Sequence, residues 1–229
     1  MKKLFRHYFR KTNYLVVFTA FLGFCSIGYA APDDDFARAI KQDDGDRVKA
    51  LIAQGFDANA ANARGDRGLS LSIREGSLKV VAVLLKWDKI QVEVRNAADE
   101  SPLMLAALDG QTEIARQLMS KGADINKSGW SALHYAATNG HLPIMQMLLD
   151  AKAVVDARAP NGNTPLMMAA RYGTIEAVRF LIAAGAEPAL VNLSNQTALD
   201  FAVGASRPDA IALLRTLQSF KIPARSASS

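Results

Sequence analysis

Thr-Pro-Leu-Met-Met-Ala, at residues 164–169, is one of four related hexapeptides that recur along this chain. The others are Ser-Pro-Leu-Met-Leu-Ala at 101–106, Ser-Ala-Leu-His-Tyr-Ala at 131–136 and Thr-Ala-Leu-Asp-Phe-Ala at 197–202, so the starts lie 30, 33 and 33 residues apart. A constant period of this size indicates one supersecondary unit that is stacked repeatedly. Stacked repeats form extended binding surfaces more often than catalytic pockets.

A common second half follows three of the hexapeptides. Gly110, Gly140 and Gly173 each lie nine residues after the initial Ser or Thr, and a pair of apolar residues comes eight and nine positions later. The hydroxyl at the start suits the cap of a short helix, and Pro suits its first turn. Each glycine is predicted to end that helix in a left-handed conformation, before a second helix with apolar residues at helical spacing.

These features resemble the ankyrin repeat, a turn and two antiparallel helices in about 33 residues with a Thr-Pro-Leu-His-x-Ala signature. The resemblance implies an all-α ankyrin-repeat solenoid of helix-turn-helix units with short finger turns. It covers residues 31–222 and includes two weaker copies upstream of the Ser101 copy. The six expected units span residues 33–62, 63–95, 96–126, 127–158, 159–191 and 192–222.

Departures from the repeat occur at two junctions and at the end. Ile90, Val92 and Val94 alternate with polar residues, which could support a short extended segment. Only four residues separate Asn126 from Ser131, so the finger turn there is expected to be shorter and the surface to have a notch. In the last unit Ser206 stands where glycine is expected, as is usual for an atypical terminal unit. Residues 223–229 are small and polar and are expected to form a flexible tail.

The first thirty residues have the layout of a secretory signal peptide. Five basic residues precede an apolar run, and Gly28-Tyr29-Ala30 places small residues where a signal peptidase reads, so cleavage is expected after Ala30. An uncleaved membrane anchor is the alternative, although the run of roughly fourteen to seventeen apolar residues is shorter than the about twenty that a span needs. A lipoprotein is disfavoured because Phe24 precedes Cys25.

The leader also explains the charge and cysteine content. The chain has 27 basic and 22 acidic residues, and its five excess positive charges all lie in the leader. The basic pI therefore does not indicate a nucleic-acid surface, and no nucleic-acid partner is expected. The single cysteine, Cys25, is in the leader too, so the exported form has no disulfide, thiol nucleophile or cysteine metal ligand.

Residues that could carry chemistry are few. His134 and His141 are seven residues apart, which is not a usual spacing for metal ligands. The resemblance implies a structural role for both: His134 occupies the signature position that typically hydrogen-bonds neighbouring turns. No nucleophile elbow, phosphate-binding loop or paired-carboxylate motif is present, so we expect no catalytic residues, no metal site and no cofactor.

The resemblance also implies where a partner would bind. Variable contact positions in this family are the finger residue before the Ser or Thr and the two residues before the helix-ending glycine. Trp130 and the pair Arg171 and Tyr172 stand out because Trp, Tyr and Arg dominate interface hot spots. Local packing is the alternative for Trp130, and stacking between units is the alternative for Tyr172. The predicted binding residues are Glu100, Leu108, Asp109, Trp130, Thr138, Asn139, Asn163, Arg171, Tyr172 and Gln196.

These observations predict an exported, non-enzymatic protein-binding module. The leader suits a bacterial Sec substrate, so the periplasm is the expected location, with another protein as partner, no stable membrane span after cleavage and a monomeric state. Either a scaffold or accessory protein for an envelope partner, or an inhibitor or immunity protein against a toxic envelope enzyme, fits this prediction. A hydrolytic or metal-dependent enzyme is a third possibility that the sequence supports poorly.

Overall fold

Six helix pairs follow one another along the described chain. The computed structural model describes residues 32–62 and 65–220, so the predicted leader at 1–30 and the tail at 223–229 lie outside the described residues. The pairs are α2 (Pro32–Lys41) with α3 (Gly45–Ala53), α4 (Gly68–Glu75) with α5 (Leu78–Lys86), α6 (Pro102–Leu108) with α7 (Thr112–Ser120), α8 (Ala132–Asn139) with α9 (Leu142–Asp150), α10 (Pro165–Tyr172) with α11 (Ile175–Ala183), and α12 (Ala198–Gly204) with α13 (Pro208–Phe220).

The repeated hexapeptides start the first helix of each of the last four pairs. The Thr164 side chain accepts the backbone N–H of Met167 at 3.3 Å, and Pro165 occupies the first turn of α10. Ser101 caps α6 and Thr197 caps α12 in the same way. The hydroxyl satisfies one of the N–H groups that a helix start leaves without a partner, as the sequence predicted.

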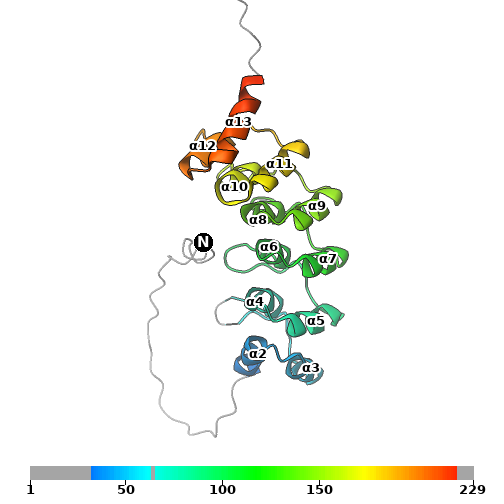
Figure 1. The fold of residues 1–229 in the computed structure, drawn as a ribbon. Helices are drawn as coiled ribbons and strands as arrows, with labels where there is room; N and C mark the ends of the chain where they lie inside the picture. The colour runs from blue at the N-terminus through cyan, green and yellow to red at the C-terminus, as the bar shows by residue number, and fades with distance from the viewer. Residues whose placement is uncertain (1–31, 63–64, 221–229) are drawn as a thin grey trace, which may run out of the picture.

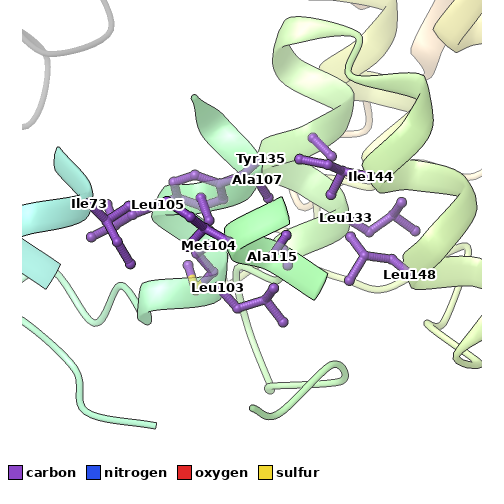
Figure 2. Close-up of a cluster of buried hydrophobic side chains, with 14 of the residues drawn as sticks. Ile73, Leu103, Met104, Leu105, Ala107, Ala115, Leu133, Tyr135, Ile144 and Leu148 are labelled. Carbon is purple, nitrogen blue, oxygen red and sulfur yellow. The ribbon is translucent and has the colours of Figure 1, made fainter. Parts of the chain in front are cut away.

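The pairs stack as two layers. One column is formed by the first helices of the pairs, α2, α4, α6, α8, α10 and α12, and the second helices form the other (Figure 1). The finger loops lie on the side of the first column in the lower part of the stack. Apolar side chains from successive units meet between the layers (Figure 2). Equivalent leucines of three consecutive units, Leu103, Leu133 and Leu166, are at most 1% exposed. The core is therefore continuous along the stack, as expected when no unit can bury its apolar face alone.

Side chains near the unit ends add hydrogen bonds between neighbours. The amide of Asn126 donates to the carbonyl of Lys152 at 2.9 Å and accepts the N–H of Val154 at 2.8 Å. Asn59 makes the corresponding pair of bonds with residues 89 and 91. These bonds satisfy backbone groups of irregular segments that no regular helix or sheet would satisfy.

Two of the three helix-ending glycines adopt the predicted conformation. Gly110 and Gly140 have φ values of 71° and 72°, in the left-handed region that favours glycine. Gly173 does not: its φ is −78° and its ψ is −164°, so the left-handed prediction is wrong there. Glycine is required at this position for a different reason, because a Cβ would lie 2.4 Å from the Ala137 carbonyl oxygen of the preceding unit.

Two other departures from regularity are resolved by the structure. Ser206, which replaces the expected glycine, has a φ of 53° and keeps the left-handed turn without glycine. The segment from Ile90 to Val94 forms no strand; within the described ranges, the isolated bridge between Ala61 and Arg67 is the only β-type pairing. Val92 and Val94 are buried instead, so their alternation reflects packing of an irregular loop against the core.

We expect Gly173→Ala to destabilise the protein by about 1–3 kcal/mol, because the new methyl group overlaps a backbone carbonyl that cannot move freely. Urea unfolding monitored by circular dichroism measures this loss. Gly204→Ala is the matched control, since a Cβ at Gly204 has no heavy atom within 4 Å. Equal unfolding midpoints for the two variants would contradict the close approach.

Candidate protein-binding surface

Finger loops precede the first helices, and backbone hydrogen bonds close four of them. In each, an N–H donates to the carbonyl four residues later: Asn62 to Asp66, Asn96 to Glu100, Ala159 to Asn163 and Asn192 to Gln196. The predicted finger residues Glu100, Asn163 and Gln196 therefore all lie at the base of a closed finger. Their carbonyl groups belong to the scaffold, and only their side chains can contribute to a surface.

Glu100 is tied to its own unit and to the next. Its carboxylate accepts the Tyr135 hydroxyl at 2.9 Å and the Asn96 amide at 2.8 Å, and the side chain is half-buried. Burial, with the adjacent Glu100 charge as a smaller contribution, raises the pKa of Tyr135 far above its ordinary value. The hydroxyl therefore stays protonated and remains a donor. Gln196, by contrast, is exposed.

Two of the predicted binding residues are buried. Thr138 is 4% exposed and its hydroxyl donates to the His134 carbonyl at 2.8 Å. Asn163 is 7% exposed and its side-chain oxygen accepts the Asn192 amide at 2.8 Å. The Thr138 bond lies within helix α8, and the Asn163 bond joins two neighbouring fingers. Only the other eight predicted residues are therefore left to contribute side chains to a binding surface.

His134 links two units. Its Nδ1 accepts the Ser131 N–H at 3.2 Å, and its Nε2 donates to the Asn163 carbonyl of the next finger at 3.0 Å. The ring is fully buried, and this burial lowers its pKa to about 4 although the backbone bonds favour the proton. His141 Nε2 lies 3.1 Å from the Leu108 carbonyl of the preceding unit. Both histidines thus have the structural contacts that the resemblance implied.

The shortened finger between Asn126 and Ser131 is built differently from the others. No backbone pair closes it among the described residues; instead the buried Lys127 ammonium pairs with Asp99 of the previous finger and donates to the Ser128 carbonyl. Trp130 is half-buried with its ring edge-on to His134 and Tyr135, at centroid distances of 5.3 and 6.5 Å. The indole therefore packs locally and still keeps part of its surface open.

The ends of the first helices form an exposed row. Asp109, Asn139, Arg171 and Tyr172 are exposed, and Leu108 is half-buried. The Asn139 amide donates to the Leu108 carbonyl at 2.6 Å, which holds neighbouring helix ends together. The Arg171 guanidinium lies 5.2 Å from the Tyr172 ring centroid and 5.7 Å from that of Phe201 in the next unit.

The predicted binding residues do not include three exposed apolar residues, one at the end of the fifth unit and two in the sixth. Leu193 is 79% exposed, Val203 48% and Val191 38%. Val203 aligns with Ala137 and Ala170, which are fully buried against a following unit. A valine where other units have alanine is the sequence feature that distinguishes position 203. The family's variable contact positions, from which the binding residues were predicted, do not include it.

Residues 32–62 and 65–220 hold no group of three or more His, Cys, Asp or Glu residues placed to bind a metal ion. None of the helices in that part of the chain is both long and apolar enough to cross a membrane.

Comparison with known proteins identifies the repeats. A family model described as ankyrin repeats in three copies matches residues 36–128, 89–159 and 151–222. The chain belongs to the ankyrin repeat family. This family is generally a non-enzymatic interaction module, and ankyrin repeats bind proteins.

Individual ankyrin relatives match over part of their length. The chain is 31% identical over 152 residues to the nuclear factor NF-kappa-B p105 subunit of Gallus gallus, covering 63% of this chain and 16% of that protein. It is 32% identical over 161 residues to the B-cell lymphoma 3 protein homolog of Mus musculus, covering 67% and 36%. The chain thus spans well under half the length of these curated relatives.

A solved structure matches over nearly its whole length. The complex of the Bd0816 predatory endopeptidase from Bdellovibrio bacteriovorus with immunity protein Bd3460 contains a chain that superposes with a TM-score of 0.69. The two chains are 30% identical, and the match covers 80% of this chain and 97% of that one. This ankyrin-repeat neighbour confirms the all-α solenoid.

We expect the folded protein to lose stability as the pH falls from about 6.5 to about 4, because His134 stays neutral when folded and becomes protonated when unfolded. The free energy of unfolding should fall by up to about 1.4 kcal/mol per pH unit in that window. His134→Met should be less stable at pH 7 but should lack this decline, since Met104 and Met167 occupy the equivalent positions in the neighbouring units.

Urea unfolding at several pH values between 7 and 4.5 measures the effect. The stability difference between the wild type and His134→Met should narrow as the pH falls. His141→Gln is the control and should retain the wild-type slope. Parallel pH profiles for the wild type and His134→Met would contradict a buried neutral His134.

Proposed function

We propose that this protein is exported to the periplasm and there binds a folded partner protein of the cell envelope. The observation that supports this proposal best is the match to a complete ankyrin chain in a two-protein complex, with 97% of that chain covered at 30% identity. The predicted leader at residues 1–30 supports the location. A rigid stack presents its helix ends and fingers with little ordering cost on binding, which favours a folded partner.

Two functions within this proposal differ in what they do to the partner. A scaffold or accessory protein would hold its envelope partner and leave its activity unchanged or raised. An inhibitor or immunity protein would block a toxic enzyme. The structural neighbour favours the second, because its complex joins an immunity protein to an endopeptidase. We therefore propose inhibition of an envelope enzyme, with a scaffolding role as the competing candidate.

Affinity capture from envelope extract, followed by mass spectrometry, identifies the partner. The captured protein is then purified and its enzymatic activity is measured with increasing amounts of this chain. Stoichiometric loss of activity supports inhibition, whereas a stable complex with full activity supports the scaffold. Absence of any stoichiometric complex would contradict the proposed function. N-terminal sequencing of the exported form tests cleavage after Ala30.

We expect Trp130→Ala and Tyr172→Ala each to weaken binding of the captured partner by about tenfold or more, because aromatic side chains contribute large contact areas at low entropic cost. Isothermal titration calorimetry with the purified partner measures the change. Leu78→Ala is the matched control, since Leu78 is 59% exposed on the second-column helix α5. Equal affinity for the control and both aromatic variants would place the interface elsewhere.

A further inference from the structure

Two aromatic rings contact Arg171, which forms no ion pair with any residue that the structure describes. Its guanidinium lies within 6 Å of two aromatic ring centroids, Tyr172 on the same helix and Phe201 on α12. Such contacts between a cation and aromatic faces restrict the side chain while leaving its N–H groups available. The salt bridges of the described residues do not include Arg171, and its side chain is exposed.

A second arginine strengthens the positive potential at the same helix end. The Arg207 guanidinium donates to the carbonyl of Arg171 in the last turn of α10 and to that of Gly173, the residue that follows the helix. These bonds offset the negative end of the helix dipole, which would otherwise repel an approaching anion. Arg207, like Arg171, has no ion pair with a described carboxylate. Two cations therefore lie together without a compensating acid in the described part of the chain.

Apolar surface borders these cations. Tyr172, whose ring lies beside the Arg171 guanidinium, is 44% exposed. Arg74 of α4 occupies the position equivalent to Arg171, but its guanidinium is paired with Asp66. Arg171 differs in having no such ion pair among the described residues.

We propose that Arg171 and Tyr172 form a docking site for a loop of a folded partner that carries an Asp or Glu side chain next to an apolar side chain. The carboxylate binds the Arg171 guanidinium through paired N–H···O bonds, while the Tyr172 ring covers the apolar neighbour. A carboxylate matches the planar donor pair of arginine. Arg171 is already ordered by the two rings, so little side-chain entropy remains to be lost on binding. This inference rests on the proposed protein-binding function and specifies the partner's chemistry.

The site is tested by selecting binding loops from a phage-displayed library. Each loop is closed by a disulfide, and the library design does not fix an acidic residue at any position. The target is the protein in the form that accumulates in expressing cells. Enriched loops are synthesised, and their dissociation constants are measured by fluorescence anisotropy. We expect the loops to share an Asp or Glu beside an aromatic or aliphatic residue. Enrichment of loops without acids, or of phosphoserine over glutamate when both are compared in one loop, would overturn the proposal.

Variants then locate the binding. Arg171→Gln should weaken the selected loops by about tenfold or more, and Arg171→Lys, which keeps the charge but loses the paired geometry, should give an intermediate loss. Arg179→Gln is the matched control, because Arg179 is an exposed arginine on the second-column helix α11 of the same unit. Tyr172→Ala should also weaken binding, whereas Leu78→Ala, at a 59% exposed position elsewhere, should not. Circular dichroism and the melting temperature establish that each variant is folded.

A double-mutant cycle separates the specific contact from general attraction. Replacing the acid of the loop by its amide should cause the same loss as Arg171→Gln, and the two changes together should cause no further loss. Additive losses, or an equal effect of Arg179→Gln, would overturn the site. Loops whose affinity falls with Trp130→Ala but not with Arg171→Gln would overturn this inference and leave the proposed protein-binding function standing. Failure to enrich any loop would count against both.

Discussion

Every other feature of this molecule depends on one constraint: a pair of short helices cannot bury its apolar face without a neighbour. The described helices have seven to thirteen residues, and helices of this length are marginal in water without tertiary packing. Stacking supplies that packing, and the alanines that follow the core leucines, such as Ala136 and Ala169, are fully buried and allow the helices to approach closely. The hydrogen bonds between units, from His134 to Asn163 for example, then set the register of one unit against the next.

Local signals were sufficient for most of the fold. A capping hydroxyl, a leucine two residues later and a glycine nine residues later each act within one helix, so Thr164 and Gly140 could be assigned from the sequence. Gly173 could not, because its conformation depends on the Ala137 carbonyl of another unit. The surface was harder to predict for the same reason. Thr138 and Asn163 occupy variable positions, yet both are buried, and the Asn163 side chain is bonded to Asn192 across the unit boundary.

The two halves of the surface differ in how firmly they are built. Around Trp130, hydrogen bonds and an ion pair already satisfy Glu100, Lys127 and Tyr135, so this region is a packed part of the scaffold with one partly open ring. Around Arg171, the charged groups are ordered but have no described acid to neutralise them. A rigid region whose polar groups are already paired contributes its shape to binding. A rigid region with an unpaired charge adds selectivity for a partner group of opposite charge. A partner that spans both regions would use each for a different purpose.

The sixth unit also differs from the other units at two positions that would face a further unit. Asp200 occupies the position at which His134 donates to the following finger, and its carboxylate instead accepts from Thr197 at 2.7 Å. A carboxylate cannot donate to a backbone carbonyl and would repel one. Val203 would in addition collide where alanine is required for close stacking. Duplication of an internal unit would therefore be tolerated during evolution, whereas growth at the C-terminal end would first require these two side chains to change.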